Sequence, residues 1–424
     1  MIQAVLLLAG ANNRFYPYNS DFHKGMIKLH GKPLLGYLIE SLVACGIDDM
    51  IIVTSRHGKH IQEYIDTHYP FLTVSYADQP VANGQGDALL KAASYIKDAF
   101  IIANPYHIDE TAVIKDIIET FEKRNVDGLI PGVYEENIHN YAAIDVEGNR
   151  IIRLVEKPAP GTETSHYRAT SAYMFKKSFL DTLAKEDPHQ YSYESAISTF
   201  AKSHHVEMFK LEDHVKPVSL KYPWHTLEMR RRLGLTQPGF ISNTAQVADS
   251  AQIDDTVYID DGAIIYPGAC ITGHTYIGKY AHIGNYSVIR DCDIGENVHI
   301  GVYSDIARSV LMENCHSHGG GFIGDSVIGK NSKLARGFTT ANKRIDRGEI
   351  LTKVKENTVN TKLTSLGVIM GSNVHTGINA STMPGVIIGS GSVVGPGVTV
   401  YKNMPEHSQI LLKQVTEQTE IIAE

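Results

Sequence analysis

The strongest constraint on the fold is an aliphatic residue at every sixth position in the C-terminal half of the chain. A helix does not repeat at six, and a single strand alternates at two. A period of six fits a parallel β-helix with three short strands per coil, in which one aliphatic side chain per side faces the core. The first uninterrupted run comprises Ile241, Val247, Ile253, Ile259, Ile265, Ile271, Ile277, Ile283 and Ile289.

The repeat resumes at residue 294 and returns again near residue 328. Residues 338–373 break the period, which predicts an insertion loop or irregular coils. The pattern resembles the left-handed β-helix of hexapeptide-repeat proteins, so we assign residues 241–410 to such a domain and 411–424 to a C-terminal tail. The later members of the repeat are Ile294, Ile300, Ile306, Ile328, Leu334, Ile388, Val394 and Val400.

Residues 1–235 alternate between strand-like and helix-like segments. This alternation predicts a Rossmann-like α/β domain with a mostly parallel sheet, whose ligands lie at the carboxyl ends of the strands. A helix over 227–235 closes this domain, and residues 236–240 form a linker. Strands are expected at 4–9, 50–54, 72–76 and 100–103, and helices at 34–45, 58–68, 86–96 and 111–124.

Composition narrows the class of protein. The chain has 424 residues and a net charge of −8, so a general nucleic-acid-binding surface is not expected. We find no apolar run of about 20 residues that would span a membrane, and no signal-peptide pattern at the N-terminus. The four cysteines show no C-x-x-C spacing, which predicts free thiols in a cytoplasmic protein.

The first apolar run leads into a loop of small residues that delivers a positive charge. Gly10 is followed by Arg14, and Lys24 comes ten residues after that arginine, ahead of Gly-Lys-Pro at 31–33. Small residues let backbone N–H groups approach an anion, and fixed cations neutralise it. The segment therefore predicts a phosphate-binding loop.

These residues resemble the start of the sugar-1-phosphate nucleotidyltransferases, a family with a GT-A-like fold. The family pattern is Leu-Ala-Ala-Gly-x-Gly-Thr-Arg-x-x-Pro, then Pro-Lys-x-Met and Gly-Lys-Pro. In this chain Asn12 replaces the second glycine, Asn13 the threonine and His23 the first proline. The resemblance implies that a sugar-1-phosphate oxygen attacks the α-phosphorus of a nucleoside triphosphate and releases pyrophosphate.

The same resemblance implies roles for individual residues. Arg14 would contact the β- and γ-phosphates, and Lys24 would lie near the α-phosphate or the leaving group. Gln79 with the segment 84–89 is similar to the motif that contacts the base. Val-Glu-Lys-Pro at 155–158 is similar to the motif that grips the sugar and its phosphate. The implied nucleotide and sugar contacts are Leu8, Ala9, Gly10, Gln79, Gly84, Glu156 and Lys157.

The two aspartates that would bind the magnesium ion expected from the family are replaced in this sequence. Tyr106 stands where the Asn-Gly-Asp motif has its aspartate, and Ser219 stands four residues before Pro-Trp in place of the second one. A phenol and a hydroxyl do not hold a hard cation as two carboxylates do. Asp109 could serve one site if the strand register differs.

Motifs in the C-terminal half resemble the acetyltransferase domain of bifunctional nucleotidyltransferase/N-acetyltransferases of UDP-N-acetylglucosamine synthesis, in their archaeal-like form. The shared residues include Asn342 and Asn379. Gly319 occupies the position of the general-base histidine, and the neighbouring His318 could serve instead. The resemblance implies acetyl-CoA as a co-substrate and a homotrimer or higher oligomer; the alternative is a purely structural trimerisation domain.

Three functional hypotheses follow from the sequence. The first is an active sugar-1-phosphate nucleotidyltransferase with an acyltransferase-like tail, and its substrates would be a nucleoside triphosphate and a sugar phosphate. The second is an acyltransferase that acts on an amino-sugar phosphate. The third is a catalytically degenerate protein that binds a nucleotide or a sugar nucleotide.

Overall fold

The computed structural model describes residues 2–108, 111–170, 172–212 and 218–418. The chain forms two compact units, and they do not coincide with a simple cut at residue 235. The first unit comprises 1–12, 22–27 and 32–220, and the second comprises 13–21, 28–31 and 221–424. Two short segments from the N-terminal half, and the helix expected to close the first domain, thus belong with the β-helix.

The parallel part of the first unit forms as the sequence predicts. The strands β1, β4 and β6 are buried between helices that show one apolar face each, as βαβ units require, and β5 at the edge is partly exposed. The strands pair in the order β5-β4-β1-β6, all parallel. They are β1 (Gln3–Leu7), β4 (Asp49–Thr54), β5 (Thr73–Asp78) and β6 (Phe100–Ala103), and the intervening helices are α1 (Leu34–Ala44), α2 (Gly58–His68), α3 (Gln85–Ala92) and α4 (Thr111–Arg124).

The remainder of this sheet is largely antiparallel, so the expectation of a mostly parallel sheet holds only for these four strands and for the pair β8 and β13. The order continues from β6 through β12, β8, β13, β10 and β9 to β11, and β11 also pairs with β8. This second pairing closes a ring of five strands around Ile130, Ile144 and Met208. The elements are β8 (Gly128–Tyr134), β9 (Ala142–Glu147), β10 (Arg150–Glu156), β11 (Tyr167–Ala169), β12 (Tyr173–Phe175), β13 (Val206–Lys210), α5 (Phe179–Leu183) and α6 (Ser192–Ser203).

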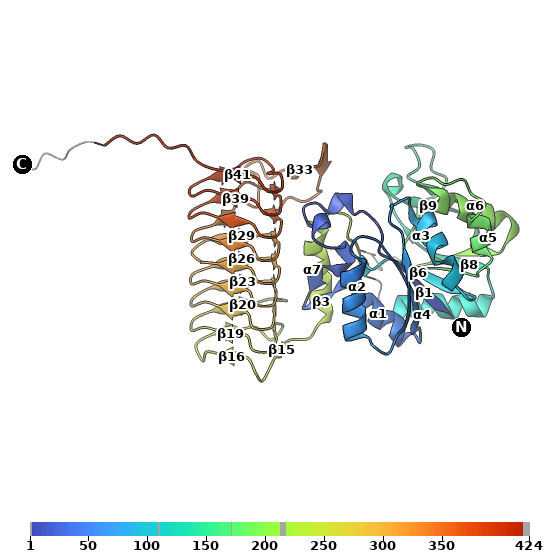
Figure 1. The fold of residues 1–424 in the computed structure, drawn as a ribbon, viewed down its shortest axis with the longest axis horizontal. Helices are drawn as coiled ribbons and strands as arrows, with labels where there is room; N and C mark the ends of the chain where they lie inside the picture. The colour runs from blue at the N-terminus through green and yellow to red at the C-terminus, as the bar shows by residue number, and fades with distance from the viewer. Residues whose placement is uncertain (1, 109–110, 171, 213–217, 419–424) are drawn as a thin grey trace, which may run out of the picture. The chain divides into compact units, whose positions relative to one another are not determined.

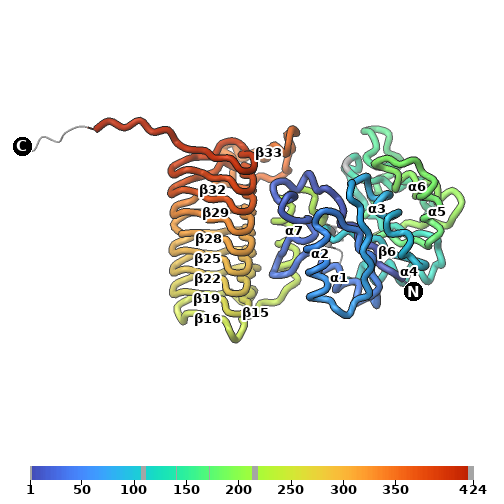
Figure 2. Tube along the Cα trace, viewed as in Figure 1, coloured from blue at the N-terminus to red at the C-terminus, as the bar shows by residue number. Residues whose placement is uncertain are grey.

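The second unit is a parallel β-helix whose coils stack one on another (Figures 1 and 2). Its faces are built from two-residue and three-residue strands. The first face has β15 (Phe240–Ile241), β18 (Tyr258–Ile259), β21 (Tyr276–Ile277), β24 (Asp293–Ile294), β27 (Val310–Leu311), β30 (Val327–Ile328), β35 (Ile369–Met370) and β38 (Ile387–Ile388). The second has β16 (Gln246–Val247), β19 (Ile264–Ile265), β22 (His282–Ile283), β25 (His299–Ile300), β28 (His316–Ser317), β31 (Lys333–Leu334), β36 (His375–Thr376), β39 (Val393–Val394) and β41 (Gln409–Ile410). The third is carried by β17 (Gln252–Ile253), β20 (Cys270–Thr272), β23 (Val288–Arg290), β26 (Asp305–Ala307) and β29 (Phe322–Gly324), then by β32 (Thr339–Thr340), β37 (Ser381–Thr382) and β40 (Thr399–Val400).

The register of the coils explains the sixfold repeat and its shorter steps, which recur on the first face from Ile277 to Ile294, to Leu311 and to Ile328. Ile259 pairs with Ile277, eighteen positions on, which is three times six. Ile277 pairs with Ile294, only seventeen positions on, because one side of that coil is a residue shorter. The paired aliphatic side chains are buried in one continuous core, so the period predicted from sequence is the spacing of inward-facing residues.

The break in the period is an inserted hairpin. Strands β33 (Leu351–Val354) and β34 (Asn357–Asn360) pair in antiparallel fashion. The insertion is shorter than the predicted 338–373, because β32 still pairs with the next coil and β35 already continues the first face. The regular β-helix therefore resumes within the segment that the sequence assigned to irregular structure.

Segments 13–21 and 28–31 join the second unit through specific polar contacts. The Tyr18 hydroxyl is fully buried and lies 2.9 Å from the carbonyl oxygens of both Val327 and Met370, on adjacent coils. In the second segment the backbone N–H of His30 donates to the Asp293 carboxylate at 2.6 Å. These contacts explain why residues distant in sequence belong to the β-helix unit.

Replacing Tyr18 by phenylalanine is expected to lower the free energy of unfolding of the β-helix unit by about 1–3 kcal/mol. The reason is that the change leaves two buried carbonyl oxygens without their shared donor. Urea titration followed by circular dichroism measures the effect, with Tyr280→Phe as a control because Tyr280 is 54% exposed. Equal stabilities for the two variants would contradict the assigned contact.

Two further sequence predictions concern global properties. All four cysteines are free thiols, as predicted. None of the helices in the described part of the chain has the length and hydropathy that a bilayer crossing requires.

Candidate functional site

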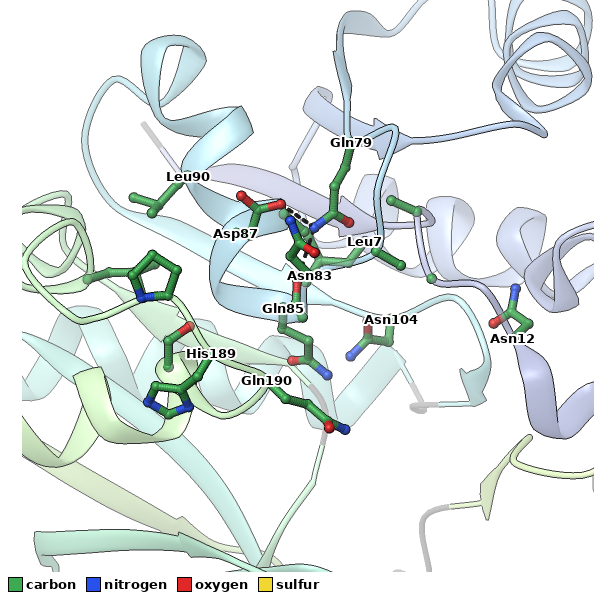
Figure 3. A pocket seen from close by; sticks show the side chains of 18 of the residues that line it. Leu7, Asn12, Gln79, Asn83, Gln85, Asp87, Leu90, Asn104, His189 and Gln190 are labelled. Atoms are coloured by element: carbon green, nitrogen blue, oxygen red, sulfur yellow. Dashed lines mark hydrogen bonds between the residues drawn. The ribbon is translucent and has the colours of Figure 1, made fainter. Parts of the chain in front are cut away.

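A cavity of about 800 Å³ lies where strands of the first unit's sheet end and loops begin. Its wall includes Gly10 after β1, Gly84 just before α3, and Gln79 after β5 and Asn104 after β6, the last two labelled in Figure 3. Open α/β sheets bind ligands at this edge, because the loops there diverge to leave a crevice. The cavity is therefore the principal candidate site.

The structure brings together part of the predicted nucleotide-binding set. Ala9, Gly10, Gln79 and Gly84 all line the cavity. Leu8 instead has its side chain in the hydrophobic core, with 1% of its surface exposed.

Arg14 is exposed in the short helix η1 (Asn13–Phe15) and belongs to the second compact unit. Its predicted phosphate contact stays a prediction.

Gln79 is held rigidly at one end of the cavity. Its side chain is 2% exposed, and its backbone N–H donates to the Thr54 carbonyl at 2.9 Å. The side-chain Nε2 donates both to the Gly84 carbonyl at 3.1 Å and to Asp87 Oδ2 at 2.7 Å (Figure 3). The sequence did not single out Asp87; an acidic residue in the first turn of a helix that opens with glycine was the available signal.

Gly84 has a backbone conformation that other residues adopt only with strain. Its φ is +97°, and a Cβ added there would lie 3.0 Å from the Gln190 carbonyl oxygen. Glycine at this position thus lets the chain turn into α3 and lets the backbone of Gln190 approach closely.

Lys24 lies in a short helix, η3 (Lys24–Met26), that begins with a side-chain cap. His23 Nδ1 accepts the Gly25 N–H at 3.1 Å, and burial, more than the charge of Lys24, lowers the pKa of His23 well below its usual value. A neutral imidazole can accept this bond. The Lys24 ammonium lies 3.2 Å from the centroid of the Tyr106 ring and donates to the Leu220 carbonyl at 3.1 Å.

The described residues do not fit the two-aspartate magnesium site of the resembling family. Tyr106 lines the cavity, and desolvation raises its pKa to about 12, so it remains a neutral phenol. Ser219 lies on β14 (Val218–Ser219), paired with β7 (His107–Ile108). No cluster of three or more metal-binding side chains occurs in the part of the chain that is described, and Asp109 lies outside it. We derive no reaction step through a metal ion.

Asp87 and Glu186 are the carboxylates in the described wall of the cavity, and both are already engaged. Asp87 accepts from Gln79, and Glu186 accepts from the Thr199 hydroxyl at 2.8 Å. Figure 3 shows Asp87 beside Gln79 and away from Asn104, which follows the strand where the family has its aspartate.

Glu156 is the last residue of β10 and Lys157 follows it, and the two side chains form an ion pair of 3.1 Å with each other. They are outside the described cavity wall, so the structure does not join them to the predicted nucleotide contacts. Lys157 has a φ of +49°, and its ammonium lies 5.9 Å from the Tyr191 ring centroid. The proposed sugar contact stays a prediction.

Glu194 on α6 is an acidic group that the sequence did not identify. Desolvation, and next the charge of Glu156, raises its pKa to about 7, and its Oε2 has no hydrogen-bond partner. Perturbed carboxyls of this kind occur often at functional sites, although buried groups elsewhere share the property.

Replacing Glu194 by glutamine is expected to stabilise the protein at pH 8 by about 2 kcal/mol and to change little at pH 4.5. The folded-state pKa lies above the unfolded value, so the favourable contribution is complete at low pH and is lost as pH rises through 7. Urea unfolding at both pH values measures the difference, with Glu122→Gln on the exposed side of α4 as control. An equal effect at both pH values would contradict the assigned titration.

The predicted acetyltransferase residues lie in the β-helix. Gly319 has a φ of +87°, and a Cβ there would lie 2.2 Å from the Val302 carbonyl oxygen, so a histidine does not fit this backbone. His318 is exposed and its neighbour His316 stacks on it with ring centroids 4.4 Å apart. His316 in turn lies above His299 on the preceding coil, at 5.4 Å.

Asn342 belongs to a polar cluster centred on Asp325. The Asp325 carboxylate accepts from Asn342 at 2.6 Å, from the Ser365 hydroxyl at 2.7 Å and from Arg308 at 2.7 and 2.9 Å. These donors lower the pKa of Asp325 despite its burial. Asn379 lies elsewhere, at a turn with a φ of +54°, where its backbone N–H donates to the Arg336 carbonyl at 2.9 Å.

Comparison with known sequences identifies relatives along the whole chain. Residues 3–215 match the nucleotidyl transferase family. "Bifunctional protein GlmU" of Methanocaldococcus jannaschii is 28% identical over 96% of this chain and 97% of its own length, and the protein of that name from Methanococcus maripaludis is 31% identical over 97% and 98%. A "bifunctional sugar-1-phosphate nucleotidylyltransferase/acetyltransferase" of Sulfurisphaera tokodaii is 28% identical over 95% of this chain and 98% of its own.

The likeness to solved structures such as the following one extends over a little more than half of the chain. A UDP-glucose pyrophosphorylase solved in complex with UDP-glucose superimposes with a TM-score of 0.51 at 21% identity, covering 56% of this chain and all of its own. At this level of identity the likeness concerns the fold. It agrees with the nucleotidyltransferase-type topology of the sheet described above.

Proposed function

Because this chain belongs to the nucleotidyl transferase family, we propose that it transfers a nucleotidyl group from a nucleoside triphosphate to a sugar 1-phosphate. The observation that carries the proposal is the cavity at the sheet edge. It combines the small-residue loop after β1 with the anchored Gln79–Gly84 segment. Its volume of about 800 Å³ is within the range of small-molecule sites.

In the proposed reaction the phosphate oxygen of the sugar 1-phosphate attacks the α-phosphorus. The bond from that phosphorus to the bridging oxygen breaks, and pyrophosphate leaves with the electron pair. The loop at Gly10 is proposed to hold phosphates through backbone N–H groups, and Lys24 to offset their charge. Glu156 and Lys157 are proposed to bind the sugar phosphate.

We further propose that the β-helix carries an acyltransferase-like domain that uses acetyl-CoA. Full-length relatives with bifunctional names support this assignment. The glycine at 319 argues against the base histidine of the resembling domain, so any proton acceptor must be another group such as His318. Assembly through the β-helix as a homotrimer is part of the same proposal.

A second candidate is a protein that binds a nucleotide or a nucleotide sugar without catalysis. Tyr106 and Ser219 favour it, because neither offers the carboxylate found at these positions in the resembling enzymes. The cavity itself serves both candidates equally.

Exchange of radiolabelled pyrophosphate into nucleoside triphosphates, with a panel of sugar phosphates and divalent cations, tests the first proposal. Exchange above background supports it, and no exchange in any condition excludes it. Acetyl-CoA consumption with amino-sugar phosphates tests the acyltransferase domain. Thermal stabilisation by a nucleotide without turnover would support the second candidate, a protein that binds a nucleotide without catalysis.

A further inference from the structure

The orientation of the Gln79 side-chain amide is fixed by two acceptors. The Gly84 carbonyl and the Asp87 carboxylate both lie within hydrogen-bond distance of Nε2, at 3.1 and 2.7 Å. Neither a carbonyl nor an ionised carboxylate can donate, so the NH₂ end must face them. The reverse orientation would place the amide oxygen against a carboxylate oxygen and leave a buried acceptor pair unsatisfied.

Gln79 therefore has only its carbonyl oxygen left for a ligand. Both N–H groups are used inside the protein, and the side chain is 2% exposed at the wall of the cavity. A ligand edge that meets this oxygen has to bring an N–H or O–H donor. A ligand edge with a hydrogen-bond acceptor at that point would face the Gln79 oxygen, and the two acceptors would have no donor between them.

The same cluster indicates which part of a nucleotide meets Gln79. The Asp87 carboxylate places a negative charge at this end of the cavity, and the bond to Gln79 keeps it there (Figure 3). Phosphates are repelled from such a charge, whereas the loop at Gly10 offers backbone N–H groups. The uncharged base is the part of a nucleotide that suits the Gln79 end.

We propose that Asp87 is a positioning residue for base recognition: by holding the Gln79 amide in one orientation, it makes the cavity select a nucleobase that donates a hydrogen bond at that point. The inference deepens the proposed function, because it rests on a nucleotide occupying this cavity. Asp87 acts through Gln79 and is not assigned a contact with the reacting atoms.

Two substitutions separate the orienting role from a general structural one. Asp87→Asn keeps an oxygen that can accept from Gln79, whereas Asp87→Leu has a similar size and no acceptor, so the amide can rotate by half a turn. Asp98→Leu is the matched control, since Asp98 is exposed on the surface after η4 (Ala93–Tyr95). The full-length protein is used throughout.

Isothermal titration with ATP, CTP, GTP and UTP gives the ratio of the tightest to the weakest affinity for each variant. We expect a ratio of at least about tenfold for the wild type, Asp87→Asn and Asp98→Leu, and a ratio reduced by about tenfold for Asp87→Leu. A purely structural role of Asp87 would leave this ratio unchanged, because a loosened helix would lower the affinity for all four nucleotides alike.

The outcomes distinguish the inference from the proposed function. A uniform loss of affinity in Asp87→Leu with an unchanged ratio would overturn the role of Asp87, and so would a reduced ratio in Asp87→Asn. Selective binding that depends on Asp87, without pyrophosphate exchange, would leave the inference standing and exclude nucleotidyl transfer. No binding of any nucleotide by the wild type would overturn both.

Discussion

Replacing Lys24 by methionine should raise the dissociation constant for a nucleoside triphosphate by roughly ten- to a hundredfold, since charge-assisted hydrogen bonds contribute about 1.5–3 kcal/mol. The ammonium lies on the Tyr106 ring, which itself lines the cavity. Methionine keeps an unbranched apolar stem of similar length against that ring and removes the charge, together with the hydrogen bond to the Leu220 carbonyl. Isothermal titration with UTP and GTP measures the change.

Lys28→Met provides the matched control for this prediction. Lys28 lies four positions on and pairs with Glu313 at 3.0 Å, so its loss removes a charge from the same stretch of chain without changing the cavity wall. We expect its nucleotide affinity to stay within about threefold of the wild type. Equal losses in both variants would show that net charge, and not the position of Lys24, controls binding.

Gly319→Ala is expected to destabilise the β-helix by about 3 kcal/mol or more. Two effects add here. A side chain at a φ of +87° costs about 1–2 kcal/mol, and the new Cβ would lie 2.2 Å from the Val302 carbonyl oxygen, which forces the backbone to move. Urea unfolding followed by circular dichroism in the β-sheet region measures the loss.

Gly320→Ala isolates the backbone effect. Its φ is +68°, but the nearest atom to an added Cβ is the Arg336 Nε at 3.5 Å, so no overlap arises. We expect a loss of about 1 kcal/mol there. If the two variants lost equal stability, the close approach at Gly319 would not be the cause. A larger loss at Gly319 would also show that any side chain at this position, a histidine included, displaces the local backbone.

Much of the secondary structure could be predicted because it depends on short-range patterns. Helices α2 (Gly58–His68) and α4 (Thr111–Arg124) begin and end where their apolar spacing predicts. The antiparallel extension of the sheet was not predicted, because apart from the β9–β10 hairpin its strands pair across long connections. The pairing of β11 with β8, which closes the ring, leaves no periodic signal in the sequence.

The candidate site was predictable in part for the same reason. Gly10, Gln79 and Gly84 follow strand ends, and strand ends of a parallel sheet converge on one edge. Asp87 escaped notice because its importance comes from a contact with Gln79, and nothing in the spacing of the two residues requires their side chains to meet. Arg14 shows the opposite case, since its motif was clear but its segment belongs to the other unit.

The sequence by itself determined the two kinds of architecture and the location of the loop after β1 that we propose to bind phosphate. Both depend on repeats and motifs of six to about thirty residues. Such short patterns follow directly from the backbone geometry of strands and helices. Only the tertiary structure decided which atoms face each other. The hydrogen bond to Asp87 orients the Gln79 amide. The Tyr18 hydroxyl contacts carbonyl oxygens on coils more than 300 positions away in the sequence. Such contacts depend on how loops close over long distances, and no local pattern records that.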